Sequence, residues 1–148
     1  MKKILFLFAA LLISASSYSQ ILNPVKWSYA TKKTGPQEAT IYIKATMDKG
    51  WHIYSQNMAD GGPVKTSFTF SPSPAYKLVG KTTEPKPFSA FEKVFKMKVS
   101  YFSQEVIFQQ KIKYTRLPAS IKGTVEYMAC DDNQCLPPAE VSFNVAVK

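Results

Sequence analysis

The segment Ile41-Tyr42-Ile43-Lys44-Ala45-Thr46-Met47 places an apolar, core-type side chain at every second position. This period of two turns one set of side chains towards a buried face and the other towards water, which is typical of a half-buried β-strand. The same alternation recurs along the chain, at Val25, Trp27 and Tyr29, at Phe68 and Phe70, at Val106, Phe108, Ile112 and Tyr114, at Val125 and Tyr127, and at Val141, Phe143, Val145 and Val147. After residue 19 no uninterrupted stretch has a helical period, so the sequence predicts a chain of short strands.

Turn-forming segments separate these strands. They are Lys33-Thr34-Gly35-Pro36, Asp60-Gly61-Gly62-Pro63, Ser71-Pro72-Ser73-Pro74, Leu117-Pro118 and Leu136-Pro137-Pro138. Short alternating strands with regular turns between them favour two packed antiparallel sheets. We predict an all-β, immunoglobulin-like antiparallel β-sandwich that forms a single domain over residues 20–148.

The first 19 residues have the pattern of a secretory signal peptide. Lys2-Lys3 precedes an apolar run from Ile4 to Ile13, and Ser17-Tyr18-Ser19 supplies the small residues of a cleavage site. The apolar run is shorter than the roughly 20 residues that a membrane-spanning helix needs. We therefore predict a soluble domain in the periplasm or another extracytoplasmic compartment, where disulfides are permitted.

The composition excludes several classes of function. Two cysteines and one histidine are too few for a Cys₄ or Cys₂His₂ zinc site, and no spacing among them supports a metal centre. The formal net charge of +9 admits polyanion binding, but the lysines are scattered and no run outside the N-terminal segment is longer than Lys32-Lys33. We expect a solvated mixed surface and no binding to nucleic acid.

The two cysteines, Cys130 and Cys135, flank Asp131-Asp132-Asn133-Gln134. A true immunoglobulin disulfide joins two sheets through cysteines that are far apart in sequence, so this pair closes only a local loop. The loop-entropy expression, extrapolated to six residues, gives roughly 2 kcal/mol of stabilisation. Small domains have a stability of roughly 5–15 kcal/mol, so the domain is expected to fold with this bond open or closed. Such a bond suits exchange chemistry.

Strand parity predicts the direction of Cys130, because one face of the preceding strand carries Ile121, Val125, Tyr127 and Ala129. In a regular strand Cys130 points away from the core, where it is more exposed than an inert structural cysteine. Asp131 and Asp132 act the other way, since their charges disfavour a neighbouring thiolate. Two interpretations stay open: a reactive disulfide, or a non-catalytic binding or assembly module whose disulfide only pins a loop.

Two stretches of the chain resemble parts of a known family. The first is Tyr127-Met128-Ala129-Cys130-Asp131 with Cys135-Leu136-Pro137-Pro138, and the second is Lys49-Gly50-Trp51-His52-Ile53-Tyr54-Ser55. Both resemble the N-terminal periplasmic domain of the thiol:disulfide interchange protein DsbD. The resemblance implies a redox disulfide, with no other cofactor, that relays electrons between thioredoxin-like proteins. It also implies that Cys135 forms the mixed disulfide with partners and that Cys130 resolves it.

The same resemblance implies aromatic residues beside the disulfide. His52 and Tyr54 occupy the matching positions, on the strand face opposite Trp51 and Ile53, and Tyr127 neighbours Cys130 in sequence. A histidine at this place is suited to proton transfer, because its ordinary pKa lies near neutrality. The alternative is that His52 is a packed residue at the rim of the site.

A loop that caps the disulfide is a further implied feature. Its counterpart is Phe91-Glu92-Lys93-Val94-Phe95-Lys96, in which Phe91, Glu92, Val94 and Phe95 are the candidate cap residues. The apolar side chains of this loop either shield the disulfide until a partner displaces them, or Phe91, Val94 and Phe95 enter the core.

The chain departs from the family pattern in three respects. Four residues separate the cysteines, one fewer than in the best-known members, and Lys96 stands where a cap glycine is expected. The sequence ends at Lys148, before any transmembrane conduit or thioredoxin-like domain of the full-length relatives. We therefore expect a monomeric module with protein-disulfide reductase-like activity, whose partners are thioredoxin-like proteins or a membrane electron donor in trans.

Overall fold

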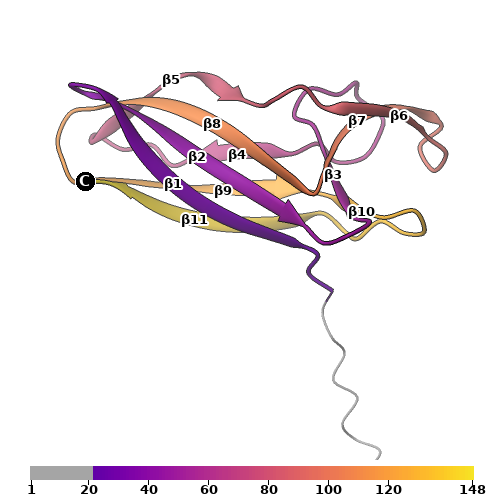
Figure 1. Ribbon diagram of the computed structural model, residues 1–148. Helices are drawn as coiled ribbons and strands as arrows, with labels where there is room; N and C mark the ends of the chain where they lie inside the picture. Colours follow the sequence, from indigo (N-terminus) through magenta and orange to yellow (C-terminus); the bar gives the residue numbers. More distant parts are fainter. Residues whose placement is uncertain (1–21) are drawn as a thin grey trace, which may run out of the picture.

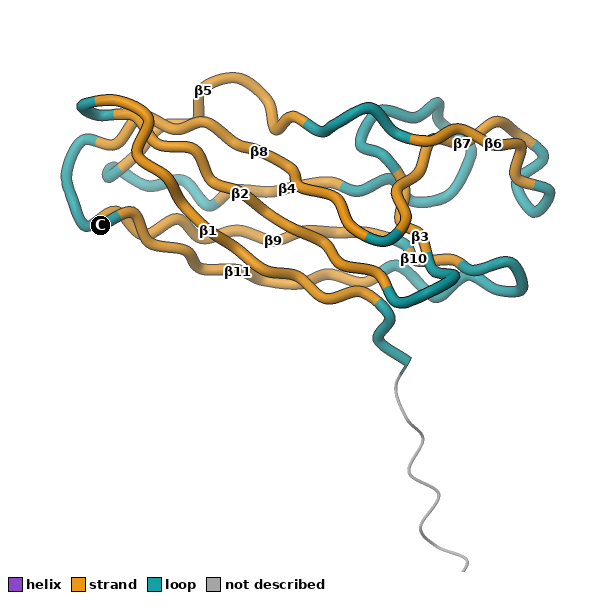
Figure 2. The backbone as a smooth tube through the Cα atoms, viewed as in Figure 1, coloured by secondary structure: helices purple, strands orange, loops and turns teal. Residues whose placement is uncertain are grey.

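The computed structural model describes residues 22–148, which form strands and loops without a helix (Figures 1 and 2). In chain order the strands are β1 (Val25–Gly35), β2 (Glu38–Met47), β3 (His52–Tyr54), β4 (Ser67–Phe70), β5 (Tyr76–Thr83), β6 (Phe88–Glu92), β7 (Met97–Ser103), β8 (Glu105–Tyr114), β9 (Ala119–Tyr127), β10 (Ala129–Cys130) and β11 (Ala139–Val147). No membrane-spanning helix is found among these residues. The proposed signal peptide, residues 1–19, lies outside the described part of the chain.

The strands form three sheets, in which every pairing is antiparallel. Two of them, with orders β1-β2-β8-β5 and β11-β9-β4, are the layers of a sandwich, and the third, β10-β3-β7-β6, extends from one end (Figure 1). The C-terminus lies at the opposite end (Figure 1). The predicted immunoglobulin-like antiparallel β-sandwich is thereby confirmed.

The main core lies between the two layers of the sandwich. Ile41 and Ile43 are fully buried, as their alternation predicts, and each fully buried side chain of this size contributes about 1.5–3 kcal/mol of hydrophobic stabilisation. Trp27 of β1 joins the layers, because its ring centroid lies 6.3 Å from that of Phe108 in β8 and 5.3 Å from that of Tyr127 in β9. Packing in this core holds the two layers of the sandwich together, and the third sheet extends from one end of them.

Three strands, β5, β6 and β7, were not among the predicted ones. β5 and β6 are edge strands, and most of their side chains are exposed on both faces, so neither shows a period of two in burial. In β5 the register shifts between Val79 and Thr83, where Gly80 takes a φ of 69°. A strand that buries no continuous face carries no alternation for a sequence pattern to detect.

Candidate functional site

Cys130 is the last residue of β10, and Cys135 follows five residues later, at the end of the sandwich that carries the third sheet. Cys130 pairs with His52 of β3 on one side and with Cys135, in an isolated bridge, on the other. A disulfide joins the cysteines, whose Cα atoms are 4.0 Å apart. Directly opposed residues of an antiparallel pair point to the same face, so Cys135, Cys130 and His52 lie in a row across three neighbouring chain segments.

Backbone hydrogen bonds hold the loop between the cysteines. Asp131 N donates to Gln134 O over 2.9 Å, and Leu136 N donates to Ala129 O over 2.9 Å. The Asp131 carboxylate accepts from Asn133 N at 2.8 Å and from Gln134 N at 2.7 Å. None of these bonds involves a sulfur atom, so the turn has support that is independent of the disulfide.

Cys130 is buried in a small apolar cluster that is separate from the main core. It is 1% exposed and packs with Tyr54 and Val99; we call these three residues the disulfide cluster. Cys130 does point away from the main core, but the expected exposure is wrong, because β3 and β7 of the third sheet supply the residues that cover it. The alternation along a strand predicts which way a side chain points, but it does not predict which other segments of the chain cover that side chain.

Cys135 differs from Cys130 in access. It is half-buried and only packs against the edge of the disulfide cluster, while the loop residues before it, Asp132 to Gln134, are exposed. A protein partner can therefore approach the disulfide from the Cys135 side, whereas Cys130 is shielded.

His52 and Tyr54 lie on the same face of β3 as the disulfide, as predicted. His52 Nε2 is 3.3 Å from Tyr54 Oη, and the ring centroids of the two residues are 5.3 Å apart. Burial lowers the pKa of His52, an effect that the charges of Glu92, Asp132 and Asp131 oppose. Burial, with Glu92 in support, raises the pKa of Tyr54. At neutral pH the pair therefore consists of a neutral imidazole and a protonated phenol.

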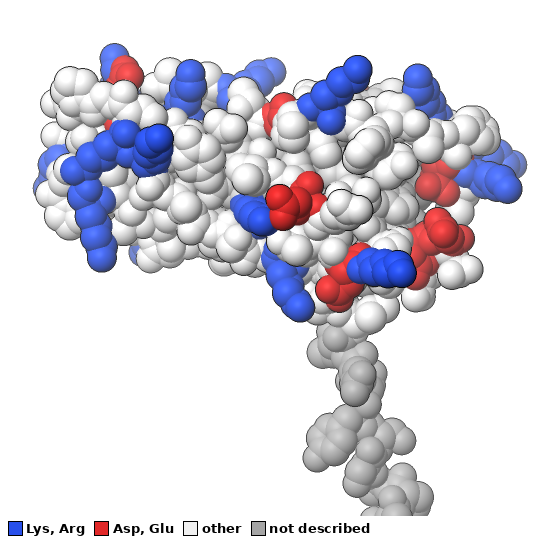
Figure 3. Space-filling model, viewed as in Figure 1, with Lys and Arg blue, Asp and Glu red and all other residues white. Residues whose placement is uncertain are grey.

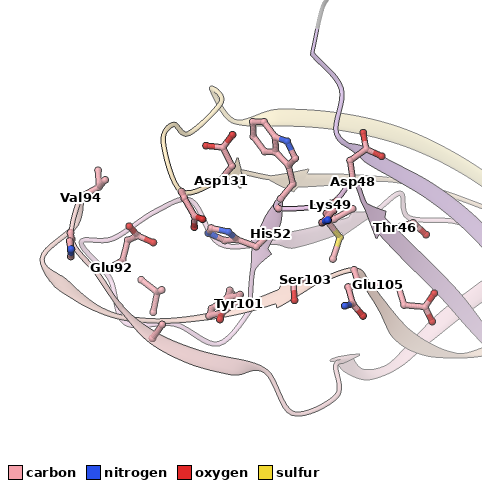
Figure 4. Close-up of a pocket in the computed structure, with 18 of the residues that line it drawn as sticks. Thr46, Asp48, Lys49, His52, Glu92, Val94, Tyr101, Ser103, Glu105 and Asp131 are labelled. Carbon is pink, nitrogen blue, oxygen red and sulfur yellow. The ribbon is translucent and has the colours of Figure 1, made fainter.

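A cleft runs past His52 between the loop that precedes β3, the β6–β7 hairpin and the loop between the cysteines (Figure 4). Its volume of about 1180 Å³ exceeds the roughly 300–1,000 Å³ of small-ligand pockets, and suits a segment of another protein. Acidic residues line it, namely Asp48, Glu92, Glu105, Asp131 and Asp132. Figure 3 shows most of the visible carboxylates at this end, while the opposite end carries mainly Lys and Arg.

The candidate cap residues lie on the β6–β7 hairpin. Phe91 is 67% exposed and Val94 is 72% exposed, so the alternative in which they enter the core is wrong. Phe95 turns inwards, with its ring edge-on to Tyr54 at a centroid distance of 6.4 Å, and Glu92 lines the cleft. Lys96 has a φ of 53°, the left-handed conformation that glycine adopts most readily, which accounts for the glycine expected at this position.

Tyr127, the remaining candidate, does not join the disulfide. It is 5% exposed and belongs to the main core, because it points to the opposite face of the strand from Cys130. Sequence reasoning missed β7, whose Val99 belongs to the disulfide cluster and whose Met97 and Tyr101 pack against it. The alternation of Met97, Val99 and Tyr101 was the signal that would have found this strand.

Fold and site together define a small β-sandwich domain that carries a short-range disulfide beside an aromatic-lined cleft at one end. The chain belongs to the family described as "Thiol:disulfide interchange protein DsbD, N-terminal", which matches residues 20–146. No curated protein has a significantly matching sequence.

Solved structures share the fold. The N-terminal periplasmic domain of ScsB from Proteus mirabilis has a TM-score of 0.64 at 17% identity, with 84% of this chain and 47% of that chain covered. The reduced DsbD N-terminal domain of Neisseria meningitidis has a TM-score of 0.59 at 16% identity, with 86% and 90% covered. The complex of the DsbD and PilB N-terminal domains from the same organism gives 0.55 at 14%, with 84% and 87% covered. This chain thus spans about half the length of the ScsB chain and nearly all of the DsbD domain.

Proposed function

We propose that this domain exchanges its Cys130–Cys135 disulfide with thioredoxin-like proteins in an extracytoplasmic compartment. The observation that carries the proposal is the unequal exposure of the two cysteines: Cys135 is half-buried and follows the exposed loop residues Asp132 to Gln134, whereas Cys130 is 1% exposed. Membership of the DsbD N-terminal family supports the exchange chemistry. A protein complex of a DsbD N-terminal domain is known in Neisseria meningitidis, which supports docking of a protein partner.

The exchange balances as a two-electron transfer. In the reduced domain the Cys135 thiolate attacks a disulfide sulfur of the oxidised partner, which forms a mixed disulfide and releases one partner thiolate. Cys130, as its thiolate, then attacks the sulfur of Cys135 and releases the second partner thiolate. The domain is oxidised to the Cys130–Cys135 disulfide, and the partner is reduced to a dithiol. The reverse sequence, with a thioredoxin-like protein or a membrane donor in trans, reloads the domain.

The β6–β7 hairpin acts as the cap in this proposal. Phe95 already contacts Tyr54 of the disulfide cluster, and the exposed Phe91 and Val94 offer apolar surface to an incoming partner. A partner that binds these side chains displaces the hairpin and reaches Cys135. Each copy of the domain works alone, with the disulfide as its redox group.

Trapping tests the roles of the two cysteines. Cys130→Ala should accumulate mixed disulfides with thioredoxin-like proteins through Cys135, whereas Cys135→Ala should trap far fewer. Equal trapping by both variants, or none by either, removes the proposal.

A second candidate function is a binding module whose disulfide only pins the loop, and the burial of Cys130 favours it, since inert structural cysteines are usually buried. The reduction potential separates the two. A value well below about −300 mV, with slow reduction by thioredoxin-like proteins, supports the structural role.

A further inference from the structure

Once the disulfide opens, Cys130 is left as a thiol inside the disulfide cluster, where it is 1% exposed. A thiolate, and not a thiol, attacks a disulfide, and apolar surroundings hold a thiol in its protonated form. Solvent bases have little access to a sulfur atom that is buried in this way. The resolving step therefore needs a proton acceptor that belongs to the protein and lies within the site.

The titratable groups around Cys130 and His52 come from four segments. Tyr54 on β3 and Tyr101 on β7 pack with Cys130, His52 of β3 pairs with it, and the charges of Glu92 on the hairpin and of Asp131 and Asp132 on the loop between the cysteines act on His52. Tyr54 is held protonated by burial, and Asp131 already accepts two backbone N–H groups. Carboxylates are in any case weaker bases than imidazole.

His52 alone combines basicity with position. It is the single histidine of the chain and stands directly opposite Cys130 in the β3–β10 pairing, where Cβ atoms are about 4.5–5.5 Å apart. Tyr54 Oη, 3.3 Å from Nε2, holds the ring, and the ring points into the cleft between Glu92 and Asp131 (Figure 4).

We propose that His52 accepts the thiol proton of Cys130 when Cys130 resolves the mixed disulfide on Cys135. The S–H bond of Cys130 breaks as a ring nitrogen of His52 takes the proton. The resulting thiolate attacks the Cys135 sulfur, a new S–S bond forms, and the thiol bound to Cys135 leaves as a thiolate. The imidazolium then returns its proton to the leaving thiolate or to water, so that His52 is neutral again.

The surroundings of His52 favour this cycle in both of its states. Burial keeps the imidazole neutral before the transfer, and the nearby carboxylates of Glu92, Asp131 and Asp132 stabilise the imidazolium that forms. The proposal takes the roles of Cys135 and Cys130 from the proposed function, but its test needs no protein partner.

The reagent 5,5′-dithiobis(2-nitrobenzoate) separates the two steps in the reduced domain. Attack by Cys135 releases one coloured thiolate, and resolution by Cys130 releases a second, so stopped-flow absorbance gives both rates across pH 5–9. In His52→Gln the second rate should fall by about 100-fold near pH 7, the lower end of the range for general base catalysis. Its dependence on pH should move up to that of an unassisted thiol, while the first rate stays within about two-fold of the wild-type value.

Two variants serve as controls. Cys130→Ala should release only one thiolate, which assigns the second release to Cys130. Tyr42→Phe, in β2 of a different sheet from the one that carries Cys130, should keep both rates.

The proposal is overturned if the second rate and its pH profile are the same in His52→Gln as in the wild type. Equal slowing of both steps also overturns it, because that result points to packing alone. Failure of the domain to trap thioredoxin-like proteins would count against the proposed function. It would not change how the rates of His52→Gln are interpreted.

Discussion

Reduction of the Cys130–Cys135 bond should weaken the domain by a small and calculable amount. The bond closes a loop of six residues, for which the loop-entropy expression gives about 2 kcal/mol at 25 °C. Little else is lost, because the turn keeps its own hydrogen bonds and the Asp131 carboxylate still caps two backbone N–H groups. The neutral Cys130 thiol stays in an apolar cluster, which suits a weakly polar side chain.

A loss of about 2 kcal/mol corresponds to a fall in Tm of about 6–10 °C for a domain of this size. The measurement is thermal unfolding followed by circular dichroism, with and without a dithiol reductant. The far-ultraviolet spectrum of the reduced protein at 25 °C should match that of the oxidised protein. A Cys130→Ala, Cys135→Ala double variant is the control, since its Tm should be low in both conditions and indifferent to the reductant.

The opposite result has a clear meaning. If reduction unfolds the domain at 25 °C, or lowers its stability by about 5 kcal/mol or more, the disulfide is a structural requirement in the range seen for essential native disulfides. A domain that unfolds whenever it accepts electrons cannot serve as a relay. The reasoning from loop size would then be refuted together with the exchange function.

Further predictions concern the supports of the site. Because burial lowers the pKa of His52, the unfolded chain takes up a proton at a higher pH than the folded chain does. The free energy of unfolding in urea should therefore fall as the pH drops from 7 to below 6.5, and it should fall less in His52→Gln. The same dependence on pH in both proteins would contradict this. Glu84→Ala removes the carboxylate that accepts hydrogen bonds from Ser55 Oγ and Gln56 N, just after β3. The free energy of unfolding in urea should fall by about 1–3 kcal/mol. A change below about 0.5 kcal/mol would show that these hydrogen bonds contribute little to stability. Phe95→Ala removes the ring contact with Tyr54 and should speed reduction of the disulfide by a small thiol about 2- to 12-fold, the equivalent of an aromatic pair; an unchanged rate would argue against a capping role.

The alternation of apolar and polar residues predicted most of the strands, because it reflects which face of a strand is buried. The segment from Ile41 to Met47 and the segment from Val141 to Val147 both form strands where the pattern placed them. The pattern did not predict β5 and β6, because edge strands without a buried face show no alternation of buried and exposed residues. The fold was therefore predictable to the extent that strands face the core.

The sequence by itself determined that the disulfide is local, because the spacing of Cys130 and Cys135 is a property of the chain alone. It also determined that Cys130 turns away from the main core, through the parity of β9 and β10. Only the tertiary structure decided that Cys130 is buried and that His52 stands opposite it. Both facts depend on the pairing of β10 with β3 and of β3 with β7, contacts between segments far apart in the chain. Local periodicity tells which way a side chain points, whereas long-range pairing decides what it meets.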